Sequence, residues 1–122
     1  MGKTEGALKI KSYSFAIRIV KLTQFLQGEY KEYVLSRQVL KSGTSIGALV
    51  KEAEFAQSKL DFINKLSIAL KEANETSYWL SLLNDTNYLE EKLFDSLQAD
   101  CKELISLLVS IVKTTKNNML LE

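Results

Sequence analysis

The side chains of this sequence that could bind a ligand are lysines and arginines with tyrosines near them. Residues 1–45 carry eight lysines and arginines against three acids, a net charge of +5, and the rest of the chain carries −4. Phosphate binding needs clustered cations, and single strands also favour aromatic side chains on which bases stack. A solvated surface whose helix faces simply differ in charge is the alternative. The residues expected to bind nucleic acid are Arg18, Lys21, Arg37 and Lys41, with Tyr13, Tyr30 and Tyr33 as stacking partners.

Carboxylates form a second candidate group. Glu72 and Glu75 lie three residues apart and share a helix face, with Glu52 on a facing helix. The chain has no histidine, so the usual di-iron ligand set is incomplete, and we expect no bound metal. A partly buried Arg37 bonded to Glu72 or Glu75 would instead fix the register of two helices as a structural ion pair. Other cations that could pair with these glutamates are Lys41 and Lys71.

Cys101 is the only cysteine, and it falls on an apolar helix stripe. A nucleophilic thiol needs an activating base, and without histidine we expect Cys101 to be a small buried hydrophobe. No arrangement of carboxylates, lysines or tyrosines resembles an acid–base site. The sequence therefore predicts a protein that is not an enzyme and that holds no cofactor.

Helical spacing predicts the elements that must position these side chains. The chain has 122 residues, enough for one domain with a core, and no proline to break a helix. Apolar residues recur at spacings of three and four in four segments, about 12–27, 33–57, 59–84 and 88–118. Short links make neighbouring helices antiparallel. We therefore expect residues 1–122 to form one all-α domain, an antiparallel up-down-up-down four-helix bundle. Its core stripes centre on Phe15, Ile19, Leu22 and Leu26, then Leu35, Val39, Ser42 and Ile46, then Leu66, Ala69, Ala73 and Leu80, then Leu97, Leu104 and Leu108.

Capping residues predict where the helices begin and end. Serine and asparagine side chains accept from the free amides of a first turn, and glycine suits a helix end. The residues outside the stripes, 1–10 and 117–122, are expected to fray. No apolar run has the length of a signal peptide or a membrane span, which favours a cytoplasmic protein. The expected caps are Ser12 or Ser14 for the first helix with Gly28 at its end, Ser58 with Asp61 for the third, and Asn87 with Glu90 for the fourth.

Two features predict that copies of the chain assemble. Gly43 and Gly47 lie four apart in a helix, where each costs about 1 kcal/mol relative to alanine, so a neighbouring helix is expected to approach them closely. That neighbour could belong to the same bundle or to another subunit. Ile68, Trp79 and Leu82 lie off the main stripe of the third helix, and a second apolar face favours burial on two sides. Scattered surface hydrophobes are the alternative to a homo-oligomer.

Four segments resemble one protein family. They are VLSRQVLKSGTSIGA at 34–48, EA at 52–53, SKLDFINKL at 58–66 and ALKEANETSYWLSLL at 69–83. They look like the four-helix-bundle family first noticed in intervening sequences within bacterial 23S ribosomal RNA genes. That family is similar to the accessory variability protein of diversity-generating retroelements, a pentameric basic barrel that works with nucleic acid. The resemblance implies a homopentamer with an RNA- or DNA-linked role.

Two functions remain open from the sequence. The first is a homo-oligomer, a pentamer by resemblance, that binds RNA or another nucleic acid weakly through the cations named above. The second is a protein-interaction scaffold that binds no nucleic acid.

Overall fold

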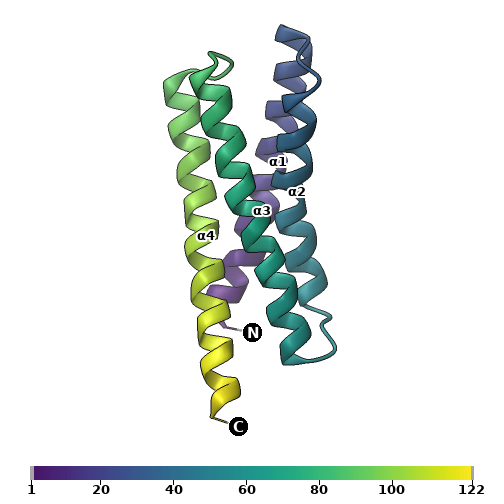
Figure 1. Ribbon diagram of the computed structural model, residues 1–122, viewed down its shortest axis with the longest axis vertical. Coiled ribbons are helices and arrows are strands. Elements are labelled where there is room, and N and C mark those ends of the chain that lie inside the picture. The colour runs from purple at the N-terminus through teal and green to yellow at the C-terminus, as the bar shows by residue number, and fades with distance from the viewer. Residues whose placement is uncertain (1, 122) are drawn as a thin grey trace.

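The computed structural model describes residues 2–121 as four α-helices: α1 (Lys3–Tyr30), α2 (Leu35–Ala53), α3 (Lys59–Asp85) and α4 (Glu91–Leu120). The helices run alternately up and down, and both ends of the chain lie at the same end of the bundle (Figure 1). Contacts within the described residues join α1 to α2, α2 to α3, α3 to α4 and α4 back to α1. Because α1 and α3 make none with each other, they occupy opposite corners. The prediction of an all-α antiparallel bundle is confirmed.

The core contains the stripes that the spacing predicted. Phe15, Ile19 and Leu26 of α1 are fully enclosed, and so are Leu104 and Leu108 of α4. Burying a side chain of this size stabilises the fold by about 1.5–3 kcal/mol, so one stripe on each helix is enough to join four helices around a common core. The α2 and α3 stripes are buried at Val39, Ser42, Ile46, Leu66, Ala69, Ala73, Thr76 and Leu80.

Polar side chains inside the core set the register between helices. The buried Thr76 hydroxyl lies 2.9 Å from the Ser42 hydroxyl across the α2–α3 contact and donates at 2.8 Å to the carbonyl of Glu72. Gln98 of α4 donates through Nε2 to the carbonyl of Ser77 at 3.1 Å. A buried polar group costs free energy unless it is bonded, so these contacts favour one vertical alignment of the helices over a shifted one.

The helices begin and end at residues that only partly match the expected caps. α3 begins as predicted: the Ser58 hydroxyl accepts from the Asp61 N–H at 3.0 Å. In contrast, α1 begins at Lys3, so Ser12 lies inside it, buried, and donates to the carbonyl of Lys9. The same helix continues past Gly28 to Tyr30 and ends at Lys31 in the left-handed region, with φ 54°. The periodic stripe that marked the core is therefore shorter than the helix itself.

Both ends of the chain are more helical than predicted. Leu8 lies within α1 and is buried, and residues 117–120 continue α4. The expectation of fraying for Met1 and Glu122 themselves lies outside the described residues. α4 begins after Glu90, which makes no side-chain cap bond, and Asn87 lies in the preceding turn at φ 69° rather than at the cap.

α2 begins with a cap that the sequence pattern did not indicate. The Glu32 carboxylate accepts from the backbone N–H groups of Val34, Leu35 and Ser36, at 3.2, 3.0 and 2.8 Å. Partial burial pushes the pKa of Glu32 up, but these donors outweigh it and hold the pKa below its usual value. A negative charge at the positive end of a helix is stabilising, so Glu32 fixes the start of α2 at Leu35, two residues after the expected start.

Candidate nucleic-acid interface

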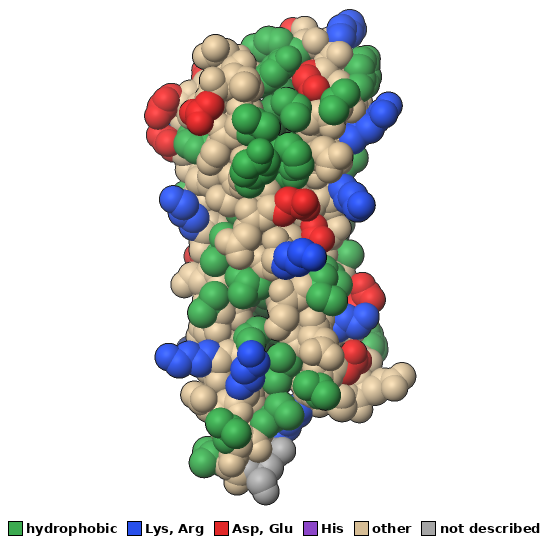
Figure 2. Space-filling model, in the orientation of Figure 1, with side chains coloured by type: hydrophobic (Ala, Val, Ile, Leu, Met, Phe, Trp, Pro, Cys, Tyr) green, Lys and Arg blue, Asp and Glu red, His purple; other side chains and the backbone are tan. Residues whose placement is uncertain are grey.

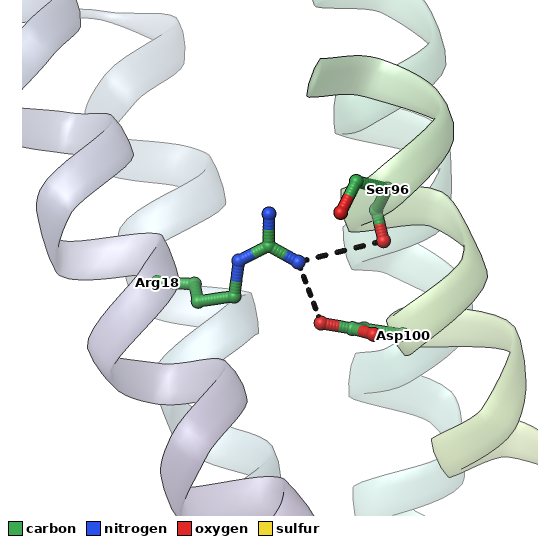
Figure 3. A network of polar contacts seen from close by, with 3 residues as sticks. All are labelled: Arg18, Ser96 and Asp100. Carbon is green, nitrogen blue, oxygen red and sulfur yellow. Dashed lines mark hydrogen bonds and ion pairs between the residues drawn. The ribbon is translucent and has the colours of Figure 1, made fainter. Parts of the chain in front are cut away.

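Arg18 is held by an acid of the neighbouring helix. Its guanidinium Nη1 donates to the Asp100 carboxylate at 2.6 Å and lies 3.5 Å from the Ser96 carbonyl, so it bridges α1 to α4 (Figure 3). A cation already neutralised by a carboxylate has less to offer a phosphate. Arg18 therefore links two helices, and Asp100 competes with the phosphate contact expected of it.

Other bases of the first half are neutralised in the same way. Lys9 of α1 lies 3.2 Å from Glu54, at the end of α2, and Lys11 lies 2.7 Å from Glu103 of α4. In each case the base comes from residues 1–45 and the acid from the remainder of the chain. The charge difference between the two halves is thus partly cancelled by the folding of one half onto the other.

Arg37 and Lys41 remain available on the outer face of α2. Both are exposed, they lie one helical turn apart, and neither makes an ion pair with another residue between 2 and 121. Figure 2 shows blue side chains following one another along the upper right edge of the molecule, over α2. Lys21 is also exposed, but it lies three residues after Arg18 and therefore shares the α4 side of α1. The four predicted cations thus form one pair on α2 and another on α1, where Arg18 is bonded to Asp100.

The tyrosines differ in what surrounds them. Tyr30 packs edge-on against Phe25 at 5.8 Å and against Tyr88 at 5.3 Å between ring centroids, at the top of the bundle. Tyr33 lies in the turn between α1 and α2, close in sequence to Arg37, and is exposed. Tyr13 is exposed in the first half of α1, more than four turns before Tyr30. Of the three, Tyr33 is the one placed to stack a base beside the α2 cations.

The expected ion pair between Arg37 and the α3 glutamates does not form within the described residues. Burial and the nearby charge of Glu75 raise the pKa of Glu72, and the lysines Lys41 and Lys71 only partly oppose that shift. Lys41 and Lys71 therefore act on Glu72 through space, but the described residues show no ion pair between either lysine and Glu72 or Glu75. Register between α2 and α3 is fixed by the Ser42–Thr76 contact instead. In residues 2–121 no three acidic, histidine or cysteine side chains lie close enough to hold a metal ion.

The two helical glycines face α1 of the same chain. A Cβ on Gly43 would lie 2.9 Å from the side chain of Ile19, and one on Gly47 would lie 3.3 Å from the Ser12 carbonyl oxygen. The prediction of close approach is therefore confirmed, but the approaching helix belongs to the same subunit. The assignment of Gly43 and Gly47 to an oligomer interface is corrected, because α1 already occupies that face.

The apolar residues off the α3 stripe are partly or fully accessible to solvent. Ile68 is exposed, and Trp79 and Leu82 are half-buried. The exposed Tyr78 packs edge-on against Trp79 with ring centroids 5.0 Å apart. Green side chains gather on the upper half of the molecule over α3 and its border with α2 (Figure 2). We refer to the surface of Ile68, Tyr78, Trp79 and Leu82 as the α3 face.

A matching surface on α1 was missed from the sequence. Ile10, Tyr13, Ile17 and Val20 are all exposed, and their spacings of three, four and three place them along one side of the helix. The spacing of these four residues was visible in the sequence. It was missed because the stripe of Phe15, Ile19 and Leu22, on another face of the same helix, was enough to explain the core. We refer to Ile10, Tyr13, Ile17 and Val20 as the α1 face.

Comparison with known proteins identifies the family. The sequence profile described as "23S rRNA-intervening sequence protein" matches residues 7–110, from the first turns of α1 to the last third of α4. The chain belongs to this family. It is also similar to a crystal structure of a protein with unknown function from the S23 ribosomal protein family of Bacteroides thetaiotaomicron VPI-5482. The two share 55% sequence identity and a TM-score of 0.89, over 90% of this chain and 98% of the other. No curated protein matches the chain.

The single thiol of the chain lies in the core. Cys101 is fully buried and donates through Sγ to the Ala73 carbonyl at 3.2 Å. Burial, followed by the charge of Asp100, raises the pKa of Cys101 to about 12. The prediction of a buried structural cysteine is confirmed. Between residues 2 and 121, no helix combines the length and the apolar character needed to cross a membrane.

Two clefts of the molecule lie beside the first half of α1. One, of about 510 Å³, lies between the start of α1 and the start of α3 and has Leu8, Val50 and Phe62 in its walls. Another, of about 420 Å³, lies between α1 and α2, with Ala16, Gly47 and Ala48 in its walls and Tyr13 beside them. Both clefts also have the side chains of Lys9 and Glu54 in their walls.

Proposed function

We propose that this chain is a non-enzymatic protein whose copies form a homo-oligomer and bind nucleic acid weakly, with RNA as the first candidate. The observation that carries the binding is the exposed pair Arg37 and Lys41 on α2, which has no ion-pair partner among residues 2–121. Membership of the 23S rRNA-intervening sequence family supports RNA as the ligand class. The resemblance to retroelement accessory proteins implies five copies.

Assembly of several copies would increase the number of cations that can bind one nucleic acid. Two cations contact too few phosphates for firm binding, since affinity grows with the number of phosphates neutralised. An oligomer repeats the α2 pair once for each copy, and linked sites bind together with a gain in avidity. The α1 and α3 faces support assembly because they leave large apolar side chains in water on a single chain.

Binding is tested by titrating a fluorescent RNA hairpin with the protein and following anisotropy. Phosphate contacts predict that affinity falls steeply between about 50 and 200 mM salt. The double variant Arg37→Gln/Lys41→Gln should bind at least several-fold more weakly at low salt. The matched control is Lys102→Gln/Lys113→Gln, which removes the same charge from exposed positions of α4. Equal loss in both double variants would show that net charge matters and the α2 pair does not.

A scaffold that binds only protein is the second candidate. The neutralisation of Lys9, Lys11 and Arg18 by acids of the same chain favours it, because it leaves a modest positive surface. If the protein assembles but binds no RNA hairpin at about 50 mM salt, where phosphate contacts are strongest, the scaffold stands and the nucleic-acid role fails.

A further inference from the structure

The α1 face is an apolar stripe that one copy of the chain cannot bury. Tyr13 is 70% exposed and Ile17 is 43% exposed, in the middle of a helix whose opposite side is in the core. A soluble helix of a lone bundle carries polar residues on its outer side. The hollow between α1 and α2 opens beside Tyr13 and is walled by small residues such as Ala16 and Ala48. The α1 face therefore has the shape to receive large side chains from a partner.

The α3 face lies at the opposite corner of the bundle. Tyr78 is 60% exposed and Ile68 is 47% exposed, and the described residues show no contact between α1 and α3. The two faces are separated by α2 and α4. The outer side of α4 between them is polar, with exposed Asp95, Lys102, Ser106, Ser110 and Lys113.

Two unlike apolar faces on opposite corners restrict how copies can associate. A two-fold dimer uses the same patch on both copies, so a dimer through either face would leave the other in water. Head-to-tail contacts join unlike patches, and they cover both faces on every copy when the rotation between neighbouring copies closes a ring. We propose that the α1 face of one copy packs against the α3 face of the next. This inference rests on the homo-oligomer proposed above and names the surfaces that form it.

Charges beside the two faces are complementary. Lys21 follows Val20 of the α1 face and makes no ion pair with another described residue. Glu75 and Glu72 lie along the α3 face between Ile68 and Trp79, one and two turns before Trp79, and likewise make none. Burial and the charge of Glu75 raise the pKa of Glu72, so a cation from a neighbouring copy would stabilise its charged form. Opposite charges at the rims would select this pairing over α1 with α1 or α3 with α3.

The pairing is tested with one charged variant on each face of the full chain, measured by size-exclusion chromatography with light scattering. Ile17→Glu blocks the α1 face and Ile68→Glu blocks the α3 face, and each alone should run as a single 13.8 kDa chain. An equal mixture retains one intact α1 face and one intact α3 face, so it should form a heterodimer of twice that mass. Val109→Glu, at a 47% exposed position of α4, is the control and should keep the wild-type mass. Circular dichroism verifies folding, and Tyr13→Glu serves if Ile17→Glu does not fold.

The outcomes separate this inference from the proposed homo-oligomer. If the wild-type protein is a single chain, both fail. If the wild-type protein assembles and either variant keeps its mass, the assembly stands and the pairing fails. If each variant alone forms a dimer, like faces pair and the head-to-tail arrangement is overturned.

Discussion

Helices α1 and α4 pack side by side and have nearly the same length, 28 and 30 residues. The side chains that they expose to solvent nevertheless differ in polarity. Each buries one stripe in the common core. The outer side of α1 carries Ile10, Tyr13, Ile17 and Val20, whereas Val109 is the one large exposed apolar residue of α4 before its last turn. The core stripe explains why both are helices of this bundle. The two helices differ on the outer side, which is apolar on α1 and mostly polar on α4.

The inner faces of these two helices should be equally important for stability, and this is the largest expected effect. Ile19→Ala in α1 and Leu108→Ala in α4 each remove a fully buried side chain, so each should lower the free energy of unfolding by about 2–5 kcal/mol. Val109→Ala, next to Leu108 but on the outer side, should change it by less than about 0.5 kcal/mol. Urea unfolding at one fixed protein concentration measures all three. A loss below about 1 kcal/mol for Leu108→Ala would mean that the α4 face is assigned wrongly.

The side of α1 that faces α2 should tolerate no extra volume. Gly43→Ala places a methyl group 2.9 Å from Ile19, and the overlap should destabilise the protein by about 1–3 kcal/mol. Gly28→Ala is the control within α1, because a Cβ there meets nothing within 4 Å. Its better helix propensity should stabilise the protein by up to about 1 kcal/mol. Equal melting temperatures for the two variants would contradict the close approach of α1 and α2. Gly47→Leu should disrupt packing for the same reason as Gly43→Ala.

The turn that leads α1 into α2 gives a smaller effect with a defined pH dependence. Glu32→Gln weakens three bonds to the start of α2 and should cost about 1 kcal/mol at pH 7. The pKa of Glu32 is lowered by folding, so its contribution is present above its ordinary pKa, near 4.5, and is lost as pH falls through the folded value. The difference between wild type and variant should therefore shrink below pH 4.5. Glu90→Gln, at the uncapped start of α4, should change stability little at either pH.

The smallest effect is expected where α1 and α4 meet. Arg18 and Asp100 form an ion pair that is a third or more exposed on both sides, and such pairs contribute about 0.2–1 kcal/mol. A double-mutant cycle with Arg18→Gln and Asp100→Asn should give a coupling energy in this range. The RNA affinity of Arg18→Gln should stay close to that of wild type. A loss of affinity as large as that of Arg37→Gln would show that Arg18 does contact phosphate.

Periodicity within one helix predicted most of the fold. The stripes at Phe15, Val39, Leu66 and Leu108 could be predicted because a core position recurs every three or four residues of the same segment. The Ser58 cap could be predicted for the same reason, since its partner lies three residues away. Helix ends without such a pattern could not, as with the start of α1 at Lys3.

The candidate site was harder to predict because it depends on contacts between helices. From the sequence, Arg18 was predicted to be a free cation. Its partner Asp100 lies 82 residues away in the chain, so only the packing of α1 against α4 shows the ion pair. Gly43 and Gly47 indicated close approach, but spacing cannot say which helix approaches. The α1 face was visible as a second stripe through Tyr13 and Ile17, although the core stripe alone was enough to explain the helix.

The most direct test of the account is the mass of the full chain in solution, measured by light scattering across a concentration range up to tens of micromolar. The account predicts one species whose mass is a fixed multiple of 13.8 kDa, because the α1 and α3 faces are buried between copies. A single 13.8 kDa chain throughout that range would contradict it, since both faces would then lie in water.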